Sequence, residues 1–81
     1  MSQKLKVKII APDKILFEGE ADYVAYPIED GERAALPGHT RLIAVLGQGD
    51  VRVKNEKQEQ RFPISKGLIK INRTELSLLV S

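Results

Sequence analysis

Hydrophobic and polar residues alternate along several short segments of the chain. Residues 4–9 read Lys-Leu-Lys-Val-Lys-Ile, and residues 51–54 read Val-Arg-Val-Lys. Successive side chains of a strand point to opposite faces, so this pattern predicts half-buried strands. Turn residues recur roughly every 8–12 positions, as in sandwiches and barrels, and no segment keeps a helical period. The pattern predicts an all-β fold, a flattened two-sheet sandwich or barrel of roughly eight to ten short, mostly antiparallel strands.

Proline and polar residues give three further expectations about single strands. Pro27 has no N–H to donate to a ladder, so a strand over residues 21–26 is expected to end there. Pro63 places the strand over residues 61–64 at a sheet edge or at a bulge. The wholly polar segment 55–60 predicts an exposed hairpin loop.

The stretch from residue 30 to residue 46 contains two turn signals and the longest uncharged apolar run, residues 42–46. Asp30-Gly31 supplies a residue that tolerates positive φ, and Pro37-Gly38 suits the two corners of a structural turn. The run is short and contains β-branched residues, which favours a strand. It has no polar face, so one side belongs to the core and the other requires cover from a loop or a partner protein. The two sides are Leu42, Ala44 and Leu46 on one, and Ile43 and Val45 on the other.

Length and composition favour one small domain over residues 1–81. The chain has no cysteine, so neither a disulfide nor a thiolate metal site is expected. Its net charge of +2 is too small to indicate a nucleic-acid partner. No apolar stretch approaches the roughly 20 residues of a membrane span, and no signal peptide pattern precedes the first strand. We therefore expect a soluble protein without direct membrane insertion.

The sequence offers little for catalysis. A single histidine, His39, follows the Pro-Gly turn, and Glu29, Asp30 and Glu32 lie nearby in sequence. A general base oriented by one of these acids is conceivable, but no triad or zinc spacing accompanies the histidine. The expectation is no catalytic residue, no metal, no cofactor and no small-molecule ligand.

An alternative function is the binding of single-stranded nucleic acid by a small β-barrel. Lys4, Lys6 and Lys8 would supply a basic face for the phosphates. Such proteins also need aromatic side chains on which bases stack. The chain has four aromatic residues, and both tyrosines lie in its acidic region, so a solvated outer strand face is the simpler interpretation.

Short motifs occur along the chain in a fixed order. They are Phe17-x-Gly19, Tyr26-Pro27, Asp30-Gly31-Glu32, Leu36-Pro37-Gly38-His39, Leu42, Gly49-x-Val51 and Ser65-x-Gly67-Leu68-Ile69. This ordered set resembles the epsilon subunit of F-type ATP synthases, specifically its N-terminal β-sandwich. The similarity extends from about Leu5 to Val80, nearly the whole chain, and its strongest part is Gly-Glu followed by Leu-Pro-Gly-His.

The resemblance implies a non-catalytic subunit of the central stalk, which acts as part of the rotor. It would link the gamma subunit to the c-ring and couple proton translocation to ATP synthesis, as a peripheral protein on the cytoplasmic face of the bacterial inner membrane. Carried over by position, the loop facing the c-ring is Glu29, Asp30, Gly31, Glu32 and Arg33. The surface facing gamma is Ala11, His39, Thr40, Leu42 and Ala44.

This chain departs from the family pattern at some positions. Arg41 stands where a proline is typical, and Lys66 replaces the first glycine of a pair. Most family members continue into an α-helical hairpin that inhibits ATP hydrolysis and in some cases binds ATP. This sequence ends at Ser81, so neither property is expected of the 81 residues.

Overall fold

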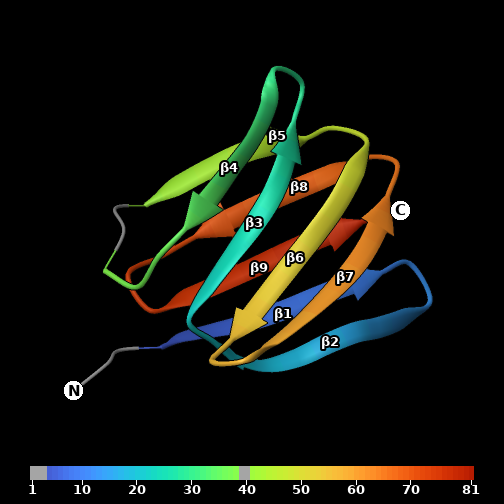
Figure 1. Cartoon of the computed structure of the whole chain (residues 1–81). Helices are drawn as coiled ribbons and strands as arrows, with labels where there is room; N and C mark the ends of the chain where they lie inside the picture. The colour runs from blue at the N-terminus through green and yellow to red at the C-terminus, as the bar shows by residue number, and fades with distance from the viewer. Residues whose placement is uncertain (1–3, 39–40) are drawn as a thin grey trace.

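The computed structural model describes residues 4–38 and 41–81 and contains nine strands within them (Figure 1). No described residue is helical, so this part of the chain has no helix able to cross a bilayer. The prediction of an all-β fold with eight to ten strands is confirmed. The strands are β1 (Leu5–Ala11), β2 (Lys14–Ala21), β3 (Tyr23–Ile28), β4 (Gly31–Ala35), β5 (Leu42–Leu46), β6 (Gly49–Asn55), β7 (Gln58–Ile64), β8 (Gly67–Ile71) and β9 (Glu75–Val80).

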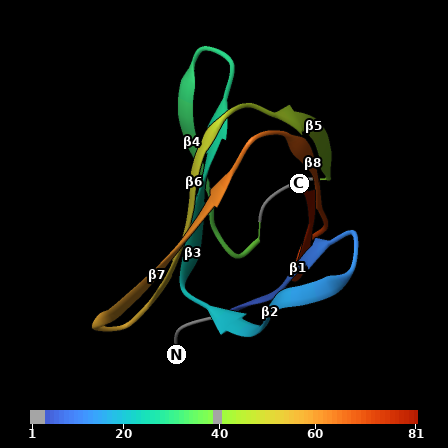
Figure 2. The same ribbon diagram turned by 90° about the vertical axis from the view of Figure 1, so that its right-hand side faces the viewer.

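The strands form two sheets that face each other, as the side view shows (Figure 2). One sheet has five strands in the order β2-β1-β9-β8-β5, and the other has four in the order β4-β3-β6-β7. All neighbours are antiparallel except β1 and β9, which run parallel. The β3–β4 hairpin extends beyond the sandwich in both views.

Alternation along the strands produces the core between the sheets. In β1 and β9 every second residue is buried, as the pattern predicts. The rings of Phe17 in β2 and Phe62 in β7 meet edge to face, with centroids 5.9 Å apart, and close one side between the sheets. The largest fully buried side chains are Leu5, Val7, Ile9, Val24, Leu46, Val51, Ile69, Ile71, Leu76 and Leu78.

Two predicted strand boundaries are wrong. Strand β3 continues through Pro27, which pairs with Glu32 of β4, because β6 pairs with β3 only as far as Ala25. Pro27 therefore has no neighbour there that needs its N–H, and its carbonyl accepts a hydrogen bond from Gly47 N at 3.0 Å. Pro63 does lie on an edge strand, β7.

The polar segment 55–60 is mostly strand rather than loop. Pairing between β6 and β7 continues to Asn55 and Gln58, so only Glu56 and Lys57 remain in the turn. The hairpin tip protrudes from the sandwich, where backbone hydrogen bonds can form without any buried side chain. The polar composition of this segment correctly predicted that it is exposed. The prediction that it is a loop was wrong.

Asp22 anchors this hairpin tip to the start of β3. Its Oδ2 accepts a hydrogen bond from Glu56 N at 2.6 Å, and its Oδ1 lies 3.2 Å from Lys4 Nζ. Glu56 has a φ of 56°, which is unusual for a residue other than glycine. The hydrogen bond from the Glu56 N–H and the adjacent Lys4 lower the pKa of the Asp22 carboxyl below its ordinary value.

Substitution of Asp22 by asparagine should therefore make the free energy of unfolding vary less with pH in the acidic range. A carboxylate whose pKa is lower in the folded state stabilises the protein above the pKa of the unfolded chain, and this stabilisation is lost as pH falls through the lower value. Urea unfolding of wild type and Asp22→Asn should show a difference in the free energy of unfolding at pH 7 that shrinks as the pH falls below the ordinary carboxyl pKa of 3.8. Asp13→Asn, in the turn after β1, is the control. If wild type and Asp22→Asn differed equally in unfolding free energy at pH 7 and in acid, this role of Asp22 would be contradicted.

Candidate functional site

The described residues contain no group of three or more His, Cys, Asp or Glu side chains that could hold a metal ion. Within this part of the chain, every buried side-chain nitrogen and oxygen atom has a hydrogen-bond partner, so no orphaned polar group marks a ligand. His39 and Thr40, which the family resemblance implied to face gamma, lie outside the described residues. The candidate functional features are therefore surfaces.

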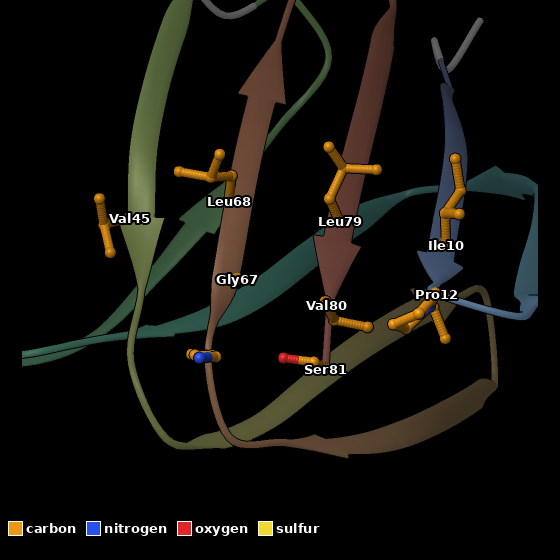
Figure 3. A pocket seen from close by; sticks show the side chains of 10 residues that line it. Ile10, Pro12, Val45, Gly67, Leu68, Leu79, Val80 and Ser81 are labelled. Carbon is orange, nitrogen blue, oxygen red and sulfur yellow. The ribbon is translucent and has the colours of Figure 1, made fainter.

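An apolar row crosses the outer face of the five-stranded sheet. Cross-strand pairing aligns Val45 of β5 with Leu68 of β8, and Leu68 with Leu79 of β9. Leu79 pairs in turn with Ile10 of β1. Residues paired in this way point to the same face of a sheet. We call Ile10, Val45, Leu68 and Leu79 the apolar row; Figure 3 shows their side chains side by side on four strands.

The apolar row is exposed and lines a groove of about 580 Å³. The exposed fractions are 71% for Val45, 52% for Leu79 and 46% for Leu68. Single exposed aliphatic residues are ordinary, whereas a contiguous apolar patch marks an interaction site. Ala11, Pro12 and Lys66 also contribute to the groove.

Only some of the residues predicted to face gamma lie at the apolar row. Ala11, the last residue of β1, lines the groove. Ala44 packs against the core, on the same side of β5 as the buried Leu46. Leu42 shares that side of β5 but is 38% exposed.

The sequence analysis did not identify Ile10, Leu68 and Leu79 as surface residues. Leu79 lies between the buried Leu78 and Val80, so it occupies the outward phase of β9. An apolar residue in the polar phase of an alternating strand was the available signal. The pairing that aligns these residues in one row joins strands distant in sequence, so this local signal could not predict it.

The second candidate surface is the tip of the β3–β4 hairpin. Glu29, Asp30, Gly31, Glu32 and Arg33 are all exposed there, and Gly31 has a φ of 141°. The tip projects beyond the rest of the sandwich (Figures 1 and 2). Its role toward a c-ring remains a prediction.

Arg52 of β6 forms ion pairs with Glu32, one of these tip residues, and with Glu59 of β7. Its Nη2 lies 2.6 Å from Glu32 Oε1 in β4, and its Nη1 lies 3.1 Å from Glu59 Oε1 in β7. Hydrogen bonding to Glu32 and the charges of both acids raise the pKa of Arg52 further above its already high ordinary value. These contacts connect β4, β6 and β7 across the outer face of the four-stranded sheet.

The structure does not favour the nucleic-acid alternative. Lys4 and Lys8 each lie near a carboxylate, of Asp22 at 3.2 Å and of Glu18 at 3.7 Å. The aromatic residues offer no stacking platform beside them, since Phe17 and Phe62 pack together and Tyr26 is buried. Tyr23 lies beneath Lys54, with 5.8 Å between the ring centroid and Nζ.

Residues 4–81 match the family model described as the ATP synthase delta/epsilon chain, beta-sandwich domain. The chain belongs to this family. An ATP synthase epsilon chain of Leptospira interrogans is 33% identical over 78 residues, which cover 96% of this chain. One from Clostridium novyi is 34% identical over 80 residues, or 98% of this chain. The chain spans 61% of the length of each of these relatives.

Two solved structures share the fold of this family member. One is a mitochondrial ATP synthase structure from Euglena gracilis containing OSCP, F1 and the c-ring, with a TM-score of 0.88 at 18% identity. That match covers 95% of this chain and 50% of the other. The second is the central stalk and c-ring of the Tetrahymena thermophila enzyme, with a TM-score of 0.79 at 13% identity, covering 98% and 64%. At these identities the similarity concerns the fold.

Proposed function

We propose that this sandwich is a non-catalytic part of the central stalk of an F-type ATP synthase, where it links the gamma subunit to the c-ring. Family membership supports the assignment to this complex, because the relatives are ATP synthase epsilon chains. In this role the sandwich turns with the rotor and couples proton translocation to ATP synthesis. It associates with the membrane only through its partners, on the cytoplasmic face of a bacterial inner membrane.

The exposed apolar row is the observation that carries the proposal. A contact that transmits torque must be held by a stiff body, and the row crosses four adjacent strands of a five-stranded sheet. Burial of its exposed side chains by a partner would contribute roughly 25 cal/mol per Å² of apolar surface covered. We place the gamma contact on this row and the adjoining Ala11, and the c-ring contact on the β3–β4 tip.

A charged residue in the apolar row should abolish the gamma contact without unfolding the chain. Leu68 is exposed, so Leu68→Asp leaves the core intact but places a carboxylate in the interface, where its desolvation is costly. We expect affinity for the gamma subunit of the same organism to fall at least tenfold, measured by isothermal titration calorimetry.

The matched control is Gln58→Asp, which adds the same charge at an exposed position of the β6–β7 tip. Its affinity for gamma should equal that of wild type. Urea unfolding of both variants establishes that they fold. Unchanged gamma binding by folded Leu68→Asp would show that the row is not the gamma contact.

A further inference from the structure

We infer that the partner segment covering the apolar row is an amphipathic α-helix with acidic residues flanking its apolar stripe. The inference rests on the proposed function, which identifies the gamma subunit as the protein that provides this helix. It adds the secondary structure and the charge of the gamma segment that binds. The evidence comes from the direction of the row and from the lysines beside it.

The direction of the row favours a helix. Its members lie on four neighbouring strands, which are spaced about 4.8 Å apart, so the row spans about 14 Å across the strands. A helix advances about 5.4 Å per turn, so one lying along the row places about one apolar side chain between each pair of strands. About three turns suffice. An extended segment would instead pair with a sheet edge and leave the middle of this face uncovered.

Lysines lie on both sides of the row. Leu68 and Lys70 occupy outward positions of β8, and Lys66, which immediately precedes the strand, lines the groove beside them. Both lysines are exposed. Lys66 continues the pairing of β8 with β9, since its carbonyl accepts a hydrogen bond from Ser81 N at 3.0 Å. Lys8 lies next to Ser77, which pairs with Lys70, on the same side as Lys70.

Lys66 and Lys70 are available to a partner. Among the described residues, no carboxylate lies within 4 Å of Lys66 or Lys70, whereas Lys8 has Glu18 at 3.7 Å. One free lysine therefore lies on each side of Leu68, and the exposed Ile43 of β5 pairs with Lys70. An apolar stripe with free positive charge on both sides is complementary to a stripe with aspartate and glutamate beside it. The same charges disfavour a second copy of this chain, because two apolar rows placed face to face would bring the lysine frames together.

Reversal of the two free charges tests the inference. The double variant Lys66→Glu/Lys70→Glu should bind gamma at least tenfold more weakly than wild type at about 50 mM salt, because attraction becomes repulsion. The difference should shrink at about 500 mM salt, where the charges are screened. The matched control is Lys57→Glu/Arg73→Glu, which changes net charge equally at two exposed positions away from the row and should bind as wild type does.

Hydrogen exchange of gamma with and without the chain identifies the segment that becomes protected. The inference requires that segment to be helical and to carry Asp or Glu beside its apolar stripe. If Leu68→Asp weakens gamma binding but Lys66→Glu/Lys70→Glu does not, the inference is wrong and the proposed function stands. If neither weakens it, the gamma contact itself lies elsewhere. Sedimentation showing a dimer of this chain that Leu68→Asp dissociates would also overturn the inference.

Discussion

Replacement of Leu78 by alanine should destabilise the protein several times more than the same replacement at its neighbour Leu79. Both residues lie in β9, but Leu78 is fully buried between the sheets, whereas Leu79 is 52% exposed on the outer face. Removal of a buried leucine side chain loses its transfer free energy and leaves a cavity, at a cost of about 2–5 kcal/mol. At Leu79 no enclosed cavity forms, so the cost should be within about 1 kcal/mol.

Thermal and urea unfolding of the two variants measure this difference. A domain of this size has a total stability of roughly 4–12 kcal/mol, so Leu78→Ala removes a large part of it. Since 1 kcal/mol shifts the midpoint by about 4–8 °C, Tm should fall by at least about 10 °C for Leu78→Ala and by a few degrees for Leu79→Ala. Gamma binding should respond in the opposite order, weakening for Leu79→Ala when both proteins are folded. Equal stability losses would contradict the assignment of the two faces.

The sequence predicted the fold class because local alternation is enough to recognise a strand. In residues 4–9 the burial pattern follows the alternation, since polar lysines and apolar residues mark the two faces unambiguously. The same signal failed at the β6–β7 tip, where both faces are exposed and no alternation is needed. It also misplaced the end of β3, because the effect of Pro27 depends on whether a neighbouring strand requires its N–H.

The candidate surface was only partly predictable for a related reason. The apolar run of β5 predicted that one of its two sides lies in the core and that the other needs cover. The structure shows that Leu46 lies in the core, whereas Val45 faces out. The assignment of Leu42 and Ala44 to gamma came from position in the family pattern, not from the phase of the strand. Alignment of Val45 with Leu68 and Leu79 depends on pairing between strands distant in sequence, which no local pattern contains.

Replacement of Gly67 by alanine should be among the most damaging single methyl additions to this chain. Gly67 begins β8 and pairs with Val80 of β9. A Cβ atom built there would lie 2.3 Å from the carbonyl oxygen of Leu79 and 3.1 Å from Val80 Cα. Both are backbone atoms, so no side-chain rotation relieves the clash and β8 must move away from β9. Overpacking of this kind costs about 1–3 kcal/mol and sometimes more, and backbone obstruction favours the upper end.

Gly19→Ala in β2 provides the matched control, because the new Cβ would lie 3.4 Å from a ring atom of Phe17, a contact that a small ring movement accommodates. We expect its unfolding free energy to stay within about 0.5 kcal/mol of wild type. Since Gly67 directly precedes Leu68 in β8, the shift of β8 forced by Gly67→Ala should also displace Leu68 relative to Leu79. The variant should therefore bind gamma more weakly even where it remains folded. Wild-type stability in Gly67→Ala would mean that β8 and β9 are not held as closely at this end as the register requires.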